Sequence, residues 1–414
     1  MISGLGAARS AWRVIRNCLR GGRFRRARLL RDITLKAVSF VQTTYDIPYS
    51  DYAGENALYL EEITGELNKL LRARNDFDIE LYTREFERLY ADFCGVSEAV
   101  GLASGTAALA YSLLGLGIGP GDEVITTPHT YIATVLAIMD AGAVPVFVDT
   151  GDDFSIDPDK IEEKINPRTK ALLPVHAYGR PCALEAIVAL ARKYRLALVE
   201  DACQAQGAAI NGAKVGSFGN AGCFSFHPSK FISGLGDGGM LVTSDPLLAQ
   251  KAREMRQPVH NSSGILKSHR SPCCLDPAHI PFLKVKLLHF REIVAKRRTI
   301  AQCYDSLLEG ISQITVIQTE KTREQVYWNY VLRVQRRDEL LEHLSGKGIQ
   351  SRVFCKIPLH LRNECRHLGY REGDFPSCEQ GCGEIISLPI SHTLPEKDAE
   401  RVAREIRHYY ARRT

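Results

Sequence analysis

The chain has 414 residues, of which 45% are hydrophobic and 24% are charged. This length and composition are typical of a globular protein with one large and one smaller domain. No apolar run approaches the roughly 18–20 residues that span a bilayer, which argues against a transmembrane protein. The net charge of +5 is concentrated in residues 1–31, which hold nine arginines and neither lysine nor acid, so the remaining chain is mildly acidic. A nucleic-acid-binding protein would carry its basic residues on the folded domain, which argues against that class as well.

Residues 1–45 form a basic N-terminal extension of two segments separated by a glycine pair. In the second segment, apolar residues recur at helical spacing at Leu30, Ile33, Ala37 and Phe40. This pattern is compatible with a helix that contacts a membrane or a partner, and the arginine-rich start also resembles a mitochondrial transit peptide. A solvated helix or a partly ordered tail explains it equally well.

From residue 58 the chain reads as helical as far as residue 93, and from about residue 98 strands alternate with helices. The expected strands are 123–126, 144–148, 171–175, 196–200, 223–226 and 240–243, with helices at 106–115, 131–141 and 183–194. Alternation of this kind predicts an α/β fold with a mostly parallel sheet covered by helices on both faces. Ligands of such sheets bind beyond the carboxyl ends of the strands.

After about residue 255 this alternation is lost, which indicates a second domain. A long helical stretch at 282–309 precedes a strand at 326–334, a helix at 338–346 and a C-terminal helix at 396–410. We therefore expect a large domain at 46–255 and a small C-terminal domain at 256–414.

The twelve cysteines are scattered through the chain, and no secretory signal peptide precedes them. Reduced thiols in a cytoplasmic protein are the better interpretation. The tightest group of metal-ligand residue types comprises His360, Cys365, His367, Cys378 and Cys382. Its spacing fits no familiar closed zinc site, so we interpret it as ordinary packing and expect no metal.

Two residues at the ends of apolar runs carry the most specific chemistry. Asp201 ends the run that begins at Leu196, and Lys230 follows the run that begins at Cys223 and precedes a glycine-rich turn. A strand-end carboxylate followed by a lysine after a second strand is the arrangement that holds pyridoxal phosphate (PLP). The lysine forms a Schiff base, and the carboxylate keeps the pyridine nitrogen protonated.

Further segments would face the same crevice, although each is ambiguous alone. Residues 103–107 (Ala-Ser-Gly-Thr-Ala) begin a helix whose N–H groups can approach a phosphate, but Ser-Gly-Thr is also a common helix cap. Tyr131 could stack on a cofactor ring or pack on its own helix. Gln204 could reach the phenolic oxygen of the ring, and Ser225 could donate a hydrogen bond to the phosphate.

Seven segments of the chain resemble the DegT/DnrJ/StrS family of PLP-dependent aminotransferases, which act on keto-sugars attached to nucleotides or on keto-cyclitols. They are ASGTAAL, TPHTYIAT, AGAVPVFVD, PVHAYGRP, VEDACQAQGA, CFSFHPSK and GLGDGGMLVT, and the resemblance continues to about residue 410. It implies a fold type I PLP enzyme, with a mostly parallel seven-stranded sheet in the large domain and a smaller C-terminal α/β domain. Members are usually homodimers with active sites at the interface.

The resemblance also implies roles for single residues. Lys230 would be the Schiff-base lysine and the proton carrier, and Asp201 would pair with the pyridine nitrogen. Gln204 would contact the phenolic oxygen and Tyr131 would stack on the ring, while Gly105, Thr106, Ala107 and Ser225 would hold the phosphate. A lysine at position 230 favours transamination, because related sugar dehydratases carry histidine there. The implied reaction transfers an amino group from glutamate or glutamine to a nucleotide-linked keto-sugar, for a cell-surface polysaccharide or a secondary metabolite.

The sequence departs from the family pattern in three places. Arg256-Gln257-Pro258-Val259 replaces an Arg-x-His-Gly element, and Pro272 stands where an asparagine typically reaches the neighbouring subunit's cofactor phosphate. Phe354-Cys355-Lys356 replaces His-Tyr-Pro. These changes leave two alternatives open, an enzyme that catalyses a PLP-assisted elimination and a non-catalytic regulator or scaffold.

Overall fold

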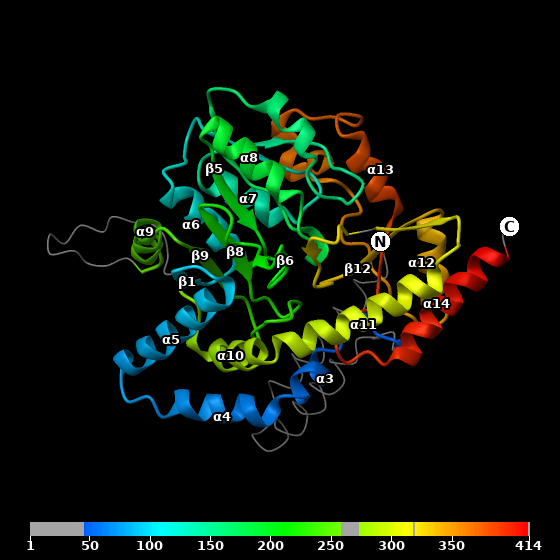
Figure 1. Ribbon diagram of the computed structural model, residues 1–414, viewed down its shortest axis with the longest axis horizontal. Helices are drawn as coiled ribbons and strands as arrows, with labels where there is room; N and C mark the ends of the chain where they lie inside the picture. The colour runs from blue at the N-terminus through cyan, green and yellow to red at the C-terminus, as the bar shows by residue number, and fades with distance from the viewer. Residues whose placement is uncertain (1–44, 258–272, 318, 413–414) are drawn as a thin grey trace, which may run out of the picture. The chain divides into compact units, whose positions relative to one another are not determined.

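The computed structural model describes residues 45–257, 273–317 and 319–412 (Figure 1). The chain divides into two units after Tyr45, and the fold described below is that of the unit beginning at Asp46. The predicted extension at 1–45 therefore lies, except for Tyr45, outside the described residues. The predicted division of the remainder into domains at 46–255 and 256–414 stays a prediction.

Seven strands form the central sheet in the order β1-β9-β8-β5-β4-β2-β3. Only β9 is reversed, since it pairs antiparallel with both β1 and β8 while the other pairs are parallel. The strands are β1 (Glu98–Leu102), β2 (Glu123–Thr126), β3 (Val144–Phe147), β4 (Thr169–Leu172), β5 (Ala197–Asp201), β8 (Ala221–Ser225) and β9 (Gly239–Thr243). The prediction of a mostly parallel seven-stranded sheet is confirmed.

Helices cover both faces of this sheet (Figure 1). Successive side chains of a strand point to opposite faces, so Val199 packs in one apolar cluster and its neighbour Leu198 in another. The Val199 face packs against α6 (Gly105–Gly115), α7 (Ile132–Asp140) and α9 (Pro246–Arg256). The opposite face packs against α5 (Asp76–Cys94), α8 (Leu184–Tyr194) and α10 (Ile280–Leu288).

Aromatic contacts fix the end of β8, from which the segment carrying Lys230 departs. The buried ring of Tyr90 on α5 meets Phe224 and Phe226 edge-on, with ring centroids 5.3 and 5.2 Å apart. Edge-to-face pairs of this kind add about 0.5–1.5 kcal/mol each to the free energy of area burial. The end of β8 and the segment that follows it are therefore held in place by their contacts with α5.

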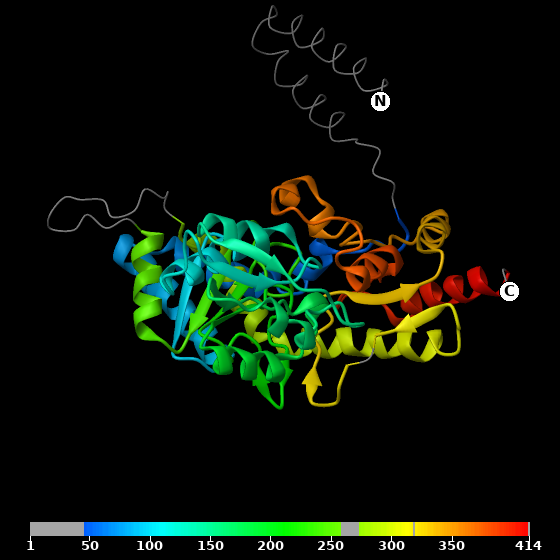
Figure 2. The same ribbon diagram turned by 90° about the horizontal axis from the view of Figure 1, so that it is seen from above.

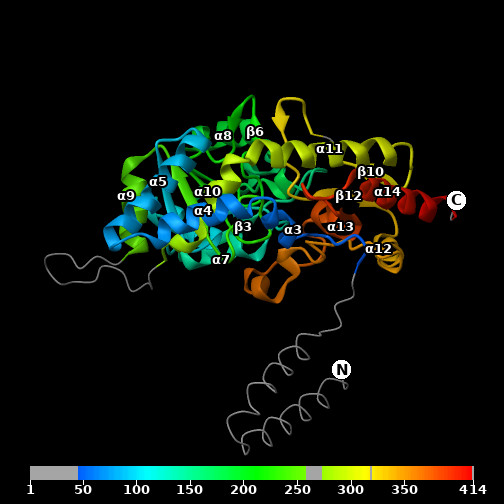
Figure 3. The ribbon, with the colours of Figure 1, turned by 90° about the horizontal axis from the view of Figure 1, so that it is seen from below.

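The C-terminal half contains a second, antiparallel sheet in the order β10-β12-β13, with α11 lying beside α14 (Figures 2 and 3). Its elements are α11 (Phe290–Leu308), β10 (Ile314–Val316), β12 (Tyr330–Val334), α12 (Arg337–Gly346), β13 (Ile385–Leu388) and α14 (Glu396–Ala411). A third small sheet joins β11 (Arg323–Glu324), β6 (Ala209–Ile210) and β7 (Ala213–Lys214). Between β12 and β13, α13 (Pro376–Glu384) packs back against Phe147 of β3 and Val135 of α7.

The structure corrects several predicted element bounds. The helical stretch at 58–93 is two helices, α4 (Leu60–Leu71) and α5. A new helix starts after Asn75, because its side chain accepts a hydrogen bond from the Asp78 N–H. A short helix, α3 (Tyr52–Ala57), precedes both. The stretch at 282–309 is likewise broken at His289, and the strand predicted at 326–334 begins only at Tyr330. Among the described residues, no helix is both long and apolar enough to cross a bilayer.

Candidate active site

A cavity of about 480 Å³ opens at the carboxyl ends of β2, β5 and β8 and at the start of α6. Of the predicted site residues, all but Ala107 line this cavity, as Gly105, Thr106, Tyr131, Asp201, Gln204, Ser225 and Lys230. The Ala107 N–H instead donates to the Ser104 hydroxyl, which caps α6. The structure thus brings together residues that are far apart in the sequence, while their individual roles stay predictions.

Lys230 presents its side-chain amine to the cavity. Its Nζ lies 3.7 Å from the ring centroid of Trp328, whose indole N–H donates to the Ser229 carbonyl at 2.8 Å. Burial lowers the pKa of Lys230 to about 8, against the opposing effects of Cys203 and Asp201. A larger share of its amine is therefore neutral near physiological pH than for an exposed lysine, and only the neutral amine is nucleophilic.

Asp201 presents a fixed, buried carboxylate at the end of β5. Its Oδ2 accepts a hydrogen bond from the Thr134 hydroxyl at 2.7 Å, and its Oδ1 accepts one from the Cys203 N–H at 3.1 Å. The side chain of Thr130 contacts that of Thr134 at 2.9 Å, which extends the network. Two donors of this kind hold the carboxylate in one orientation within the cavity.

The start of α6 packs very closely against the ends of β5 and β8. A Cβ added to Gly105 would lie 2.7 Å from the sulfur of Cys203 and 3.0 Å from the Cβ of Ser225. Only glycine therefore allows this approach, which places a helix N-terminus beside the Ser225 hydroxyl. Backbone N–H groups and the dipole at such a terminus attract a phosphate.

The two remaining predicted residues differ in how firmly they are held. Gln204 uses its side-chain oxygen to accept the N–H of Tyr178 at 2.8 Å, so its amide nitrogen is directed elsewhere as a donor. Tyr131 is 70% exposed, although it lines the cavity. Its ring is not packed on its own helix, which leaves it able to stack on a bound ring.

The structure adds wall residues to which the sequence analysis assigned no role in the site. Trp328 and Phe354 come from the C-terminal half, and their ring centroids lie 5.3 Å apart. Tyr178 has a left-handed backbone (φ 60°), and its hydroxyl contacts His129 Nε2 at 2.7 Å. Signals were available in the sequence, because Phe354 stands in a segment that departs from the family pattern and Tyr178 precedes Gly179, which has a positive φ, in the family-like segment PVHAYGRP.

The departures from the family pattern are only partly within the described residues, because Pro258, Val259 and Pro272 lie outside them. Arg256 pairs with the buried Glu87 carboxylate and donates to the Gly101 carbonyl at 2.9 Å, so it supports β1 from behind. Phe354 and Cys355, by contrast, line the cavity itself. The altered segment at 354–356 therefore forms part of the site.

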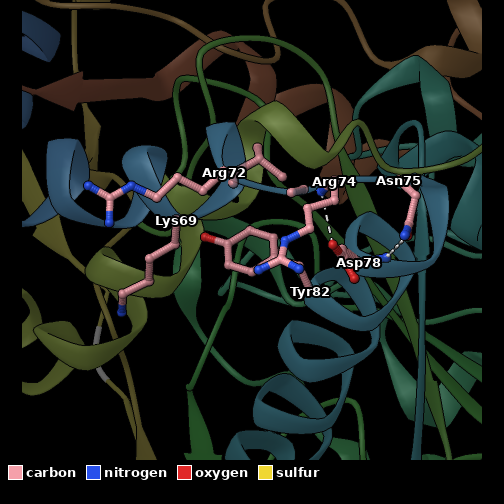
Figure 4. A pocket seen from close by; sticks show the side chains of 8 residues that line it. Lys69, Arg72, Arg74, Asn75, Asp78 and Tyr82 are labelled. Atoms are coloured by element: carbon pink, nitrogen blue, oxygen red, sulfur yellow. Dashed lines mark hydrogen bonds between the residues drawn. The ribbon is translucent and has the colours of Figure 1, made fainter.

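A second hollow of similar volume lies at the turn between α4 and α5 (Figure 4). It is lined by three cationic side chains, those of Lys69, Arg72 and Arg74, and the Arg74 N–H donates to Asp78 Oδ2 at 2.9 Å. These side chains are largely exposed, and the hydrogen bond to Glu66 raises the pKa of the Lys69 amine, which keeps that amine protonated and therefore not nucleophilic. Among the described residues that line it, this second hollow therefore lacks a neutral amine of the kind that Lys230 supplies in the main cavity.

The donor set of the main cavity fits PLP. A half-buried amine, a fixed carboxylate and a helix N-terminus are all present in the lining, and a side chain at Gly105 would collide with Cys203 and Ser225. These groups match the aldehyde, pyridine nitrogen and phosphate that distinguish this cofactor.

Comparison with known proteins agrees with this geometry. The chain is 39% identical over 361 residues to the erythromycin biosynthesis sensory transduction protein EryC1 of Saccharopolyspora erythraea, covering 86% of this chain and 98% of that protein. It is 38% identical over 328 residues to the dTDP-3-amino-3,4,6-trideoxy-alpha-D-glucose transaminase of Streptomyces venezuelae, covering 79% and 86%.

Among solved structures, that of S. venezuelae DesV in complex with a ketimine intermediate superposes with a TM-score of 0.84 at 34% identity, covering 88% of this chain and 98% of that one. Residues 60–407 match the sequence pattern shared by the DegT/DnrJ/EryC1/StrS aminotransferases. The match spans nearly all of the described residues, including both sides of the cavity. The chain therefore belongs to the DegT/DnrJ/EryC1/StrS aminotransferase family.

Proposed function

We propose that this protein is a PLP-dependent aminotransferase that transfers an amino group from glutamate or glutamine to a nucleotide-linked keto-sugar. The observation that carries the proposal is the pairing of Lys230 and Asp201 in one cavity with the α6 N-terminus. The named activity of the S. venezuelae dTDP-sugar transaminase supports the substrate class. Amino sugars of this kind would serve a cell-surface polysaccharide or a secondary metabolite.

When bound, PLP would supply an electron sink for the pair of electrons left at the donor's α-carbon. The chain's own residues would do the rest. Asp201, held by Thr134, would keep a proton on the pyridine nitrogen, and the α6 N-terminus with Ser225 would hold the phosphate. Gln204 would donate to the phenolic oxygen.

Lys230 would move the proton that transamination requires. Its pKa of about 8 lies close to working pH, so the amine can both accept and release a proton without a large free-energy penalty. The ring of Trp328, whose centroid lies 3.7 Å from Lys230 Nζ, would limit the positions that the amine can take. General acid–base transfer by a side chain held in this way accelerates a reaction by about 10²–10⁴-fold.

The sugar would enter over the exposed ring of Tyr131 and beside Phe354, where the cavity is open. We propose a homodimer in which a second copy completes this side, as is usual in the family. The eleven free cysteines among the described residues support a reducing compartment, and we propose the cytoplasm.

A direct test uses purified protein incubated with PLP, glutamate or glutamine, and a panel of dTDP- and UDP-linked keto-sugars. We expect a visible absorbance band that disappears on adding the amino donor, and an aminated sugar detected by mass spectrometry. Lys230→Ala should abolish both, whereas Lys397→Ala, at an exposed position on α14 outside the cavity, should leave them unchanged. Release of water or ammonia without consumption of donor would instead identify an elimination.

A second candidate function is that of a regulator, which is favoured by the similarity to EryC1, a protein named for sensory transduction. A regulator built on this fold would bind PLP and give the visible band, but no amino donor would change it. Turnover with any donor and acceptor would exclude this alternative as the sole function.

A further inference from the structure

Four side chains of metal-binding types come together at one side of the active-site cavity, and two of them, His129 and Cys355, also line it. His129 follows β2, Cys355 lies in the segment before Leu359, and Cys378 and Cys382 are one turn apart on α13. All four are buried, with exposed fractions of 1%, 7%, 0% and 1%. Ligand atoms of His129, Cys355 and Cys382 all lie within 4.8 Å of one another, the one such group among the residues that the structure describes.

Three distances within this cluster lie near the edge lengths of a small tetrahedron, although the Cys378 sulfur falls outside the group whose ligand atoms are all within 4.8 Å of one another. The sulfurs of Cys355 and Cys382 are 3.5 Å apart, and His129 Nδ1 lies 3.4 Å from the Cys382 sulfur and 4.0 Å from the Cys378 sulfur. A tetrahedral Zn²⁺ with Zn–S bonds of about 2.3 Å and Zn–N bonds of about 2.0 Å separates its ligand atoms by roughly 3.5–3.8 Å. A zinc ion therefore fits after side-chain movements of about 1 Å, the largest of them at Cys378.

The imidazole of His129 is oriented for this purpose. Its Nε2 contacts the Tyr178 hydroxyl at 2.7 Å, and its ring stacks on Phe154 with centroids 4.8 Å apart and an interplanar angle of 16°. When Nε2 keeps the proton and donates it to Tyr178, the lone pair of Nδ1 points toward the three sulfurs. Histidine ligands of zinc are characteristically fixed by a hydrogen bond at the second nitrogen in this way.

A buried cation lies where the charge of the ligands would require one. Three thiolates and Zn²⁺ carry a net charge of −1, and the guanidinium of Arg337 lies at the end of α13. Its Nη1 donates to the carbonyl oxygens of Cys382 and Ile385, each at 3.0 Å, and only 6% of Arg337 is exposed. Its Nε also donates to the exposed Asp338 carboxylate at 2.6 Å, so Arg337 would offset only the part of the charge that this ion pair leaves.

We propose that His129, Cys355, Cys378 and Cys382 bind one Zn²⁺ in a closed, structural site. Four protein ligands leave no open position for substrate, so the ion takes no part in the reaction. It joins α13 and the segment after Phe354 to the segment after β2, and thereby holds Phe354 and Tyr178 in the cavity wall. This inference goes beyond the proposed function and does not depend on turnover.

The proposed ligands differ from the tightest group of ligand residue types in the sequence, which we interpreted as ordinary packing with no metal, and the fold separates the members of that group. His360 Nε2 pairs with the Glu379 carboxylate at 2.9 Å, and Cys365 is buried in the same apolar cluster without joining the four ligands. The alternative explanation is that the three cysteines act as small apolar residues with weak S–H donors. Cys365 has that role, which makes it the matched control.

The test measures metal in the full-length protein, purified with a reducing agent and without chelators from zinc-supplemented cells. We expect about one zinc per chain by mass spectrometry of the elements. Replacement with Co²⁺ should give intense thiolate-to-metal charge-transfer bands and the visible bands of tetrahedral cobalt. Cys378→Ser and Cys382→Ser should each lower bound metal at least about tenfold, while Cys365→Ser should leave it unchanged.

The cobalt spectrum of the unmodified protein keeps the proposal falsifiable even where a serine variant fails to fold. Absence of stoichiometric zinc together with absence of the charge-transfer bands would overturn it. A disulfide between Cys355 and Cys382 in the reduced-purified protein, detected by peptide mass, would overturn it as well. None of these measurements depends on PLP or on an identified sugar, so their failure is distinguishable from failure of the proposed aminotransferase activity.

Discussion

Glu200 is a buried carboxylate that ties the segment before β8 to the end of β5, next to Asp201. Its Oε1 accepts the N–H groups of Phe218 and Gly219 at 2.8 and 2.9 Å, and its Oε2 accepts that of Gly216 at 2.7 Å. The fourth contact is His176 Nε2, 3.1 Å from Oε2.

The histidine donates in this contact. His176 Nδ1 accepts the N–H of Cys182 at 3.2 Å, so the ring proton lies on Nε2 and points to Glu200. The carboxylate therefore receives four donors and donates to none. This arrangement gives Glu200→Gln a predictable cost, even though the two side chains have nearly the same shape.

In Glu200→Gln, one of the two acceptor oxygens becomes an NH₂ group. Whichever way the amide is turned, two of the four donors face another donor instead of an acceptor. Each buried donor left without a partner costs about 1–3 kcal/mol, so we expect the free energy of unfolding to fall by roughly 2–6 kcal/mol. A change of tautomer at His176 gives no relief, because it would leave the Cys182 N–H without its acceptor.

The assay is urea unfolding of the cofactor-free protein at fixed concentration, combined with hydrogen exchange of the amides at 216–219. Glu200→Gln should lower the unfolding midpoint and speed exchange at these amides. The control is Glu185→Gln, at an exposed carboxylate that pairs loosely with Arg323 at 3.7 Å and should change the free energy by less than about 0.5 kcal/mol. A loss below about 1 kcal/mol with unchanged exchange at 216–219 would refute the anchoring role of Glu200.

Three further outcomes are expected. Gly105→Ala should weaken PLP binding by about tenfold or more in a fluorescence titration. The added Cβ would lie 2.7 Å from the Cys203 sulfur and displace the start of α6. Unchanged affinity would contradict the close packing of α6 against Cys203 as a condition of cofactor binding. Trp328→Ala should lower kcat by about 2–30-fold while Trp328→Phe retains most of it, since the ring faces the Lys230 amine at 3.7 Å; equal rates for both variants would exclude the contact. Burial and the neighbouring Arg297 lower the pKa of His392 to about 3, so stability is fully present above about pH 6.5 and is lost as pH falls toward 3, because the unfolded chain then binds a proton that the folded chain does not. His392→Phe should flatten this dependence in urea unfolding measured from pH 7 to 4, and an unchanged slope would contradict it.

The large sheet could be predicted because its signal is local. Its parallel strands are buried on both faces, so they read as short apolar runs between helices. The reversal of β9 could not be predicted, since direction is set by the segment carrying Lys230 and not by the composition of Gly239–Thr243. The helix at Pro376–Glu384 also went unpredicted: two glycines and two cysteines give it little intrinsic propensity, and burial against Phe147 stabilises it instead.

The residues of the site also differ in whether a local sequence pattern predicts their position. Asp201 and Lys230 follow strands directly, so strand order alone places them at one edge of the sheet. Trp328 and Phe354 reach the cavity from the C-terminal half; the departure at 354–356 marked the segment of Phe354, whereas nothing in the local sequence of Trp328 indicates that approach. Ala107 was expected to hold the phosphate, and in the structure its N–H donates to the Ser104 hydroxyl that caps α6.

The departures at 354–356 bear on the choice between enzyme and regulator. A segment that had lost its function would be expected to pack loosely, yet Phe354 contacts the rings of both Trp328 and Tyr49, with centroids 5.3 and 5.7 Å away. Its neighbour Cys355 joins the proposed zinc ligands. Both replacements therefore make specific contacts that support the wall opposite Lys230. A wall rebuilt around an intact amine and carboxylate is what a change of acceptor would require, and this favours a transaminase with altered substrate preference over a protein that has ceased to catalyse.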